Sequence, residues 1–166
     1  MTEDKKPFMP AKAGSEEWET PPEMFDPLNK EFKFNIDAAA SGINAKCDHF
    51  FSKHSDAINT QWPTGARVWL NPPYSQKMLE AFSKKAVHEC IHRNCTTVML
   101  VPVKADQAWW HNLWDFHSIS DQVSIEYRWI KGRVRFMQDG VPCKNTIMVP
   151  CCIIVIKPMG DGVASW

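Results

Sequence analysis

The stretch that decides the fold is Val68-Trp69-Leu70-Asn71-Pro72-Pro73-Tyr74. Its first three residues are bulky and apolar and run directly into turn formers, which is typical of a short buried strand. Proline then ends the strand, because it lacks an N–H donor and its ring fixes φ. The stiff exit has a backbone carbonyl that no neighbouring N–H can easily bond, Asn71 places a side-chain carbonyl beside it, and Tyr74 adds a flat ring. Two acceptors and a stacking face at the end of a strand suit a planar amide or amino group, such as that of an extruded adenine.

The tetrapeptide resembles the catalytic motif of S-adenosylmethionine-dependent amino-methyltransferases, above all the small phage-type DNA adenine methyltransferases of the Dam group. The resemblance covers Trp18 to about Lys157. It implies S-adenosylmethionine as cofactor, adenine-containing DNA as partner, and base flipping before methyl transfer. It also implies catalytic roles for Asn71, Pro72, Pro73 and Tyr74. Without the resemblance, the motif reads as a strand followed by a Pro-Pro turn and a core tyrosine.

Length and charge set the broad class. The 166 residues predict one domain with a substantial core, residues 18–166, preceded by a flexible polar arm, residues 1–17. Nineteen basic and nineteen acidic residues give a formal net charge of zero, which argues against a purely electrostatic DNA binder. The sequence has no signal peptide and no apolar run that could span a bilayer, so we expect a bacterial or phage-infected host cytoplasm. A monomer is slightly favoured.

The six cysteines have irregular spacings and predict free, buried thiols in a reducing compartment. Cys151 and Cys152 are adjacent in an apolar strand, so their side chains should point to opposite faces. His88-x-Cys90-x-His92-x-x-Cys95 does not have the spacing of paired zinc ligands. We expect a helix end there and no metal site.

The segment Trp18-Glu19-Thr20-Pro21-Pro22-Glu23 begins a predicted helix, with apolar residues at helical spacing after it. Thr20 and Glu23 have the spacing of a capping box, and Pro21 takes the favoured first position. Pro27 should kink or break this helix. The segment also resembles the part of adenine methyltransferases beside the cofactor's methionine carboxylate, which implies cofactor contacts from Thr20 and Pro21. The two interpretations are compatible, because a helix N-terminus attracts anions.

Residues 32–37 alternate apolar and polar and predict a strand that ends in Asp37, followed by alanines. An acid and then small residues let a nucleotide-like cofactor approach the backbone. The stretch resembles the first cofactor motif of the methyltransferases, although alanines replace its usual glycines. The resemblance implies cofactor contacts from Asp37, Ala38, Ala39 and Asp56, together with Asn71. Asp37 could equally cap a strand-to-helix turn, and Asp56 could equally be a solvated cap.

The middle of the chain predicts alternating helices and strands. Ser75 begins a helix that Asn94 ends, and residues 96–101 form an unbroken β-type run suited to a central parallel strand. Asp106 can cap a further helix. This helix carries a stripe of large apolar side chains, namely Trp109, Trp110, Leu113 and Trp114. Such a stripe usually packs in the core, and the alternative is a platform on which bases stack.

The end of the chain predicts a hairpin with a turn at Asp139-Gly140 and a long apolar strand over residues 146–156, interrupted by Pro150. Before the turn, Val134 and Phe136 share one face, with Arg133 and Arg135 on the other. The arginines either solvate an exposed sheet face or contact phosphates. The stretch also resembles the methyltransferase segment that places an aromatic edge against the flipped base, which implies that role for Phe136.

Together these elements predict an α/β fold: a three-layer, doubly wound, mostly parallel sheet with an antiparallel C-terminal hairpin, the methyltransferase version of the Rossmann-like fold. The predicted function is methyl transfer from S-adenosylmethionine to the exocyclic amino group of adenine in DNA. Two alternatives stay open. One is a protein glutamine methyltransferase, whose target is likewise a planar amide, and the other is a non-catalytic DNA-binding protein that retains the fold.

Overall fold

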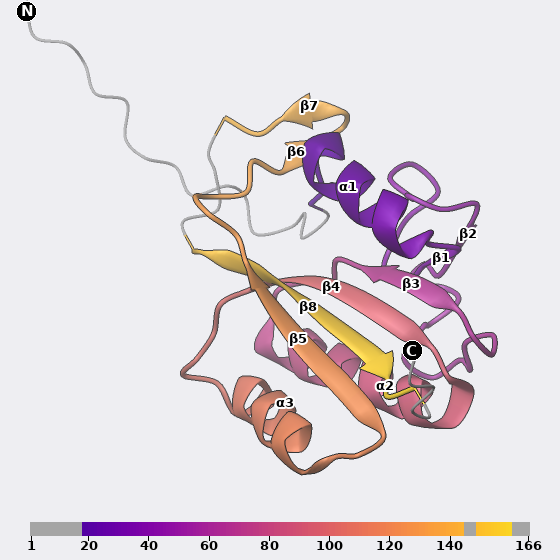
Figure 1. The fold of residues 1–166 in the computed structure, drawn as a ribbon. Helices are drawn as coiled ribbons and strands as arrows, with labels where there is room; N and C mark the ends of the chain where they lie inside the picture. The colour runs from indigo at the N-terminus through magenta and orange to yellow at the C-terminus, as the bar shows by residue number, and fades with distance from the viewer. Residues whose placement is uncertain (1–17, 145–148, 161–166) are drawn as a thin grey trace, which may run out of the picture.

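The chain forms a six-stranded sheet with helices on both faces, as seen in a computed structural model that describes residues 18–144 and 149–160 (Figure 1). The predicted arm, residues 1–17, lies outside the described residues. The strand order is β2-β1-β3-β4-β8-β5. The strands are β1 Ile36–Asp37, β2 His49–Phe50, β3 Arg67–Leu70, β4 Thr96–Pro102, β5 Val123–Trp129 and β8 Cys151–Pro158.

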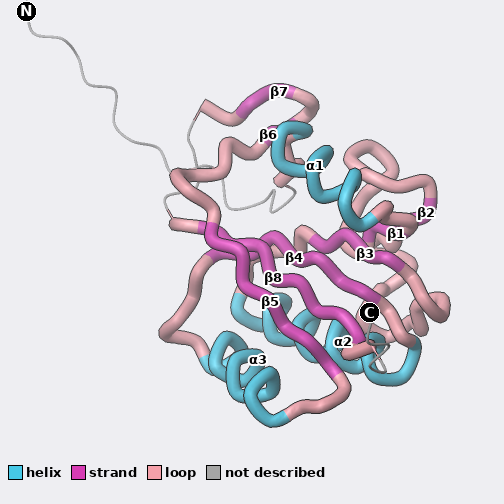
Figure 2. The backbone as a smooth tube through the Cα atoms, in the orientation of Figure 1, coloured by secondary structure: helices cyan, strands magenta, loops and turns pink. Residues whose placement is uncertain are grey.

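Strands β1 to β4 pair in parallel, and β8 lies antiparallel between β4 and β5. Five of the six strands therefore run in one direction, and β8 alone is reversed. Helix α1 (Pro22–Phe32) covers one face, whereas α2 (Gln76–Arg93) and α3 (Ala108–Ile119) cover the other (Figure 2). This arrangement confirms the predicted three-layer α/β fold.

The two faces of the sheet carry separate cores, because successive side chains of a strand point to opposite sides. Val68, Leu70 and Cys152 pack beneath α2 and α3, whereas Trp69 and Cys151 pack on the α1 side. The adjacent cysteines thus point apart, as predicted, and all six cysteines are free thiols. Among the described residues, no helix combines the length and apolar character that a membrane crossing requires.

Helix α1 begins differently from the prediction. Pro21 is the N-cap residue, Pro22 takes the first helical position, and no side chain caps the end. The predicted capping by Thr20 is therefore wrong. Pro27 does not break the helix, because the helix continues through it to Phe32; the alternative of a kink stays a prediction. The helix then ends at Lys33, whose φ of 53° is left-handed.

The other helices follow the prediction closely. Helix α2 begins after Ser75 and ends at Asn94, which has a φ of 57°. Helix α3 begins one residue later than predicted, with Gln107 as the N-cap residue in place of Asp106.

The strands differ from the prediction in three places. Strand β1 contains only Ile36–Asp37, because α1 extends to Phe32 and Phe34 packs in the α1-side core. Strand β5 was not predicted. The Asp139-Gly140 turn does join a hairpin, but its strands, β6 (Met137–Gln138) and β7 (Val141–Pro142), form a separate sheet beside the first turn of α1 (Figure 1). The strand predicted over residues 146–156 corresponds to β8, which begins at Cys151 and pairs with β4 and β5 instead. Residues 145–148 of that prediction lie outside the described residues.

Trp69 is the central side chain of the α1-side core, and its removal should destabilise the fold. It is 1% exposed, and its ring lies 5.3 Å from Phe25 and 5.6 Å from Phe34 between centroids. We expect Trp69→Ala to lower the free energy of unfolding by about 3–5 kcal/mol, because the loss combines burial and a residual cavity. Urea denaturation followed by circular dichroism measures this.

The control is Ile43→Ala, at a side chain that is 90% exposed. Its unfolding free energy should stay within about 0.5 kcal/mol of the parent value. Equal stability of the two variants would contradict the packing role of Trp69.

Candidate active site

The candidate site lies at the carboxyl ends of β1 and β3. These strands are parallel neighbours, with Asp37 in register with Trp69, and the Ala38 N–H donates to the Trp69 carbonyl at 2.9 Å. The residues that follow each strand therefore emerge side by side. In open α/β sheets this edge is where ligands bind.

The amide of Asn71 is held at both ends. Its Nδ2 donates to the backbone carbonyl of Trp18 at 2.7 Å, and its Oδ1 accepts a hydrogen bond from the Tyr74 hydroxyl at 3.1 Å. The contact with a carbonyl requires the amide nitrogen on that side. The orientation of the amide is thus fixed, and Oδ1 is the group left to accept hydrogens.

Tyr74 is half-buried and packs between the two cores. Its ring meets Phe136 edge-on, with centroids 6.0 Å apart at 80°. Its hydroxyl also lies 3.4 Å from the Leu100 carbonyl oxygen. Burial raises the pKa of Tyr74 well above its ordinary value, so the hydroxyl stays protonated and remains a donor.

A cavity of about 380 Å³ opens beside Asn71 and Pro73. Small side chains form one part of its wall, where Ala38, Ala39 and Ala40 let a ligand approach the backbone. Asp56 lies at the same cavity. The structure therefore brings together four residues predicted to contact the cofactor: Ala38, Ala39, Asp56 and Asn71.

The sequence did not identify several residues that line this cavity. The predominantly apolar part of the lining comes from loops and from α2: Trp18, Phe51, Ile58, Met78 and Phe82. A helical or loop apolar residue that faces a cavity has the same local pattern as one that faces the core, so no sequence signal separates them.

Asp37 is buried, and its carboxylate holds the following turn. Oδ1 accepts the Ala39 N–H at 3.2 Å, and Oδ2 accepts the Lys46 N–H at 3.0 Å. Burial raises the pKa of Asp37, although these two hydrogen bonds oppose the shift. Asp37 therefore caps a turn, as predicted, but β2 follows that turn in place of the predicted helix. The residue also borders a small recess beside Asn71.

Thr20 borders the same recess with a hydroxyl that has no partner. The residue is 2% exposed, and within the described part of the chain its Oγ1 makes no hydrogen bond. Buried hydroxyls are nearly always paired in folded proteins. The recess beside Asn71 and Lys46 measures about 10 Å³, which leaves the unpaired hydroxyl room for one water-sized polar atom.

Asp56 caps a turn at the mouth of the cavity. Its φ is 44°, its Oδ1 accepts the N–H groups of Ile58 and Asn59, and its Oδ2 accepts the Asn59 Nδ2 at 2.6 Å. The hydrogen bond from the Asn59 side chain is the main cause of its lowered pKa. The solvated-cap interpretation is correct, and the carboxylate nevertheless lines the cavity.

The contact of Phe136 with a flipped base, which the resemblance implies, stays a prediction. Phe136 is 1% exposed and lies between Trp18, at 6.1 Å, and Tyr74. Arg133 and Arg135 are exposed while Val134 is buried, so the predicted alternation of faces is confirmed. In this conformation Phe136 supports the rings of Trp18 and Tyr74.

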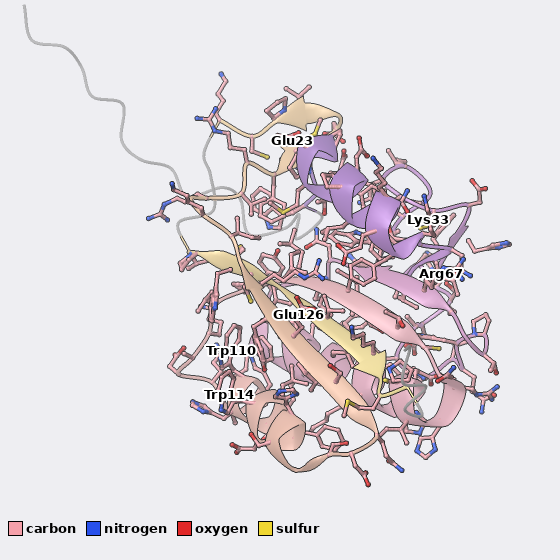
Figure 3. All side chains as sticks on the ribbon, viewed as in Figure 1. Glu23, Lys33, Arg67, Trp110, Trp114 and Glu126 are labelled. Carbon is pink, nitrogen blue, oxygen red and sulfur yellow. The ribbon has the colours of Figure 1, made fainter. Side chains whose placement is uncertain are left out.

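The tryptophans of α3 are mainly core. Trp109 and Trp110 are buried, whereas Trp114 is 53% exposed. Figure 3 shows Trp110 and Trp114 on the helix, on the face of the sheet away from α1. The core interpretation is therefore correct for Trp109 and Trp110.

The histidines of α2 lie away from the nearby cysteine. His88 and His92 pack ring to ring, 4.4 Å apart, whereas Cys90 points into the core. Within residues 18–144 and 149–160, no group of three or more His, Cys, Asp or Glu side chains has the geometry of a metal site.

Comparisons with known proteins agree with this geometry. The family model for DNA N-6-adenine-methyltransferase (Dam) matches residues 10–161. A DNA N-6-adenine-methyltransferase of Escherichia phage T1 is 38% identical over 93 residues, which are 55% of this chain and 38% of the relative. One of Haemophilus phage HP1 (strain HP1c1) is 30% identical over 100 residues, or 59% of this chain and 56% of the relative. The chain thus spans about half the length of these relatives.

Asp37 should make the stability of the protein depend on pH. Its raised pKa means that the folded state keeps this proton at pH values above 3.8, where the unfolded state has lost it. The contribution of Asp37 to the free energy of unfolding therefore decreases as pH rises through that window. We expect the stability difference between the parent protein and Asp37→Asn to fall as pH rises above the ordinary pKa of 3.8, as measured by urea denaturation.

Asp56→Asn is the matched control, because the pKa of Asp56 is lowered. Its contribution is present above 3.8 and is lost as pH falls. The two difference curves should have opposite slopes, and parallel slopes would count against the account of Asp37.

Proposed function

The chain belongs to the DNA N-6-adenine-methyltransferase (Dam) family, and from that premise we propose that it transfers a methyl group from S-adenosylmethionine to the exocyclic amino group of adenine in DNA. The observation that carries the proposal is the fixed amide of Asn71. The Trp18 carbonyl orients it, and Asn71 borders the cavity walled by Ala38, Ala39 and Ala40.

The cavity and the recess beside it suit the proposed cofactor. Ala38, Ala39 and Asp56 would hold the nucleoside part, because small residues allow close approach and a carboxylate accepts hydrogen bonds from amino or hydroxyl groups. The unpaired Thr20 hydroxyl would donate to the carboxylate of the methionine part, beside Pro21. When bound, S-adenosylmethionine supplies a methyl group already activated on a sulfonium.

Asn71 and Pro72 would make the adenine amino group reactive. The lone pair of that nitrogen is delocalised into the ring, so the free base is a poor nucleophile. The Asn71 Oδ1 and the Pro72 carbonyl would accept the two amino hydrogens and draw the nitrogen toward tetrahedral geometry. These contacts strengthen as positive charge develops on nitrogen, so they stabilise the transition state more than the ground state.

Tyr74 would recover part of the cost of base extrusion, which is about a few kcal/mol. An amide oxygen has two acceptor sites, so Asn71 Oδ1 can keep its bond to the Tyr74 hydroxyl while accepting an adenine hydrogen. The edge-on contact with Phe136 leaves at least one face of the Tyr74 ring uncovered by Phe136, and the base would stack on such a face. Pro73, which borders the cavity, would keep this segment stiff.

DNA would approach across the exposed arginines that precede β6. Arg133 and Arg135 lie on the solvent side of a segment whose other side holds Phe136. We assign these two guanidinium groups to phosphate contacts, which position a duplex without reading its sequence.

Asn71→Ala should abolish methyl transfer while cofactor binding largely survives. Loss of a transition-state acceptor of this kind costs about 10²–10³ in rate. Transfer of tritiated methyl groups to adenine-containing DNA measures the rate, and calorimetry with S-adenosylmethionine measures the affinity.

The control for Asn71→Ala is Lys84→Ala, on the exposed surface of α2, which should keep the parent rate. A protein substrate assayed in parallel tests the glutamine-methyltransferase alternative. Near-parent turnover of Asn71→Ala would remove the basis of the proposal.

Thr20→Val should separate cofactor binding from stability. Valine has a similar shape and lacks the unpaired hydroxyl, so the free energy of unfolding should stay equal or rise by up to about 1 kcal/mol. The affinity for S-adenosylmethionine should fall by about 1.5–3 kcal/mol, the worth of a hydrogen bond to a charged group, or roughly tenfold to a hundredfold in Kd. Unchanged affinity, measured by calorimetry, would exclude Thr20 from the cofactor site.

A further inference from the structure

Trp18 borders a second cavity besides the one beside Asn71. This second cavity measures about 290 Å³ and is formed with the β6–β7 hairpin. It contains no residue of the Asn71-Pro72-Pro73-Tyr74 motif. Its lining consists of Trp18, Gln138, Asp139, Val141, Pro142, Cys143 and Lys144.

The hairpin is joined to Asn71 through the segment that contains Trp18. The backbone N–H and carbonyl of Glu19 pair with those of Met137, with both hydrogen bonds at 2.9 Å. One residue earlier, the Trp18 carbonyl accepts the Asn71 amide. A ligand held by the hairpin is therefore separated from Asn71 by only the short segment that contains Trp18 and Glu19.

The second cavity has the donor and acceptor set of a nucleotide site. Trp18 borders the cavity, and an indole is a ring on which a base can stack. The Asp139 carboxylate accepts hydrogen bonds from exocyclic amino groups, and the Gln138 amide can both donate to and accept from a base edge. The Lys144 ammonium suits a phosphate. An aromatic ring, two base-reading groups and one cation are what a single nucleotide needs.

We propose that the second cavity holds a nucleotide next to the target adenine and that Asp139, with Gln138, reads its base. The proposal rests on the proposed function. The target adenine itself must reach Asn71, which borders the first cavity, so the second cavity serves a neighbouring position. The chain then selects its DNA sequence through the hairpin, and Trp18 separates the base that is read from the site where the methyl group is transferred.

The test is methylation of a DNA library in which the bases around one adenine are randomised. Asp139→Asn is the decisive variant, because asparagine keeps the size of the side chain and tolerates the φ of 52° at this turn position. It replaces an acceptor-only group with one that also donates. We expect the base preference at a position flanking the methylated adenine to change by about fivefold to a hundredfold.

Glu23→Gln is the matched control, since it makes the same carboxylate-to-amide change at an exposed position of α1 near the hairpin (Figure 3). Its sequence profile should equal that of the parent protein. Lys144→Ala should instead weaken binding about equally for all sequences and reduce the salt dependence of binding.

The outcomes separate the two proposals. If the parent protein methylates DNA and Asp139→Asn keeps the parent profile, the inference is overturned and the proposed function stands. A uniform loss of methylation in Asp139→Asn would overturn the inference too, because a base-reading group changes preference. If the parent protein methylates no DNA under saturating cofactor, both proposals fail.

Discussion

The hydrogen bond from the Asn71 amide to the Trp18 carbonyl is the contact on which the rest of the site depends. It joins two segments 53 residues apart in sequence at 2.7 Å. Without it the amide could turn over and present its nitrogen, a donor, where an acceptor is required. The Tyr74 hydroxyl supports the same orientation from the other end. A rotatable polar group is thus converted into a fixed acceptor, and electrostatic preorganisation of this kind lowers reaction barriers because no reorganisation is left for the reaction itself.

The sheet places the Asn71 amide beside the residues with which it forms the site. Because β1 and β3 are adjacent and parallel, the small residues after Asp37 and the amide of Asn71 reach the same edge. Trp69 anchors β3 from the α1 side, and Leu70 anchors it from the other side. A strand held in two cores cannot slip without exposing one of them. The rigidity of Asn71 therefore derives from burial on both faces of the sheet, and the hydrogen bond only sets its final rotation.

The sequence predicted what periodicity and turn chemistry encode. It identified the helices, the central strands, the Asp139-Gly140 turn and a minority of the residues that line the cavity. It could not identify the Trp18 carbonyl, because every residue carries a backbone carbonyl. Burial of Phe136 depends on Trp18 and Tyr74, which are distant in sequence, so alternation alone left its exposure open. Thr20 does not cap helix α1, because the helix begins at Pro22 and Thr20 borders the recess instead. Strand β5 could have been predicted, because the sequence itself contains the alternation of Val123, Ile125 and Tyr127 that is typical of a strand.

Three rings connect the fixed amide to the rest of the molecule. Phe136 contacts both Trp18 and Tyr74, and its carbonyl accepts the Cys143 N–H at 2.9 Å, just beyond β7. Trp18 and Tyr74 are also the two residues that hold the ends of the Asn71 amide. A displacement of the hairpin is therefore transmitted to both partners of Asn71 through Phe136, in addition to the backbone pairing at Glu19. Because packed aromatic groups tolerate few alternative arrangements, the hairpin and the amide must adopt compatible positions, which gives the hairpin a direct mechanical influence on the acceptor geometry.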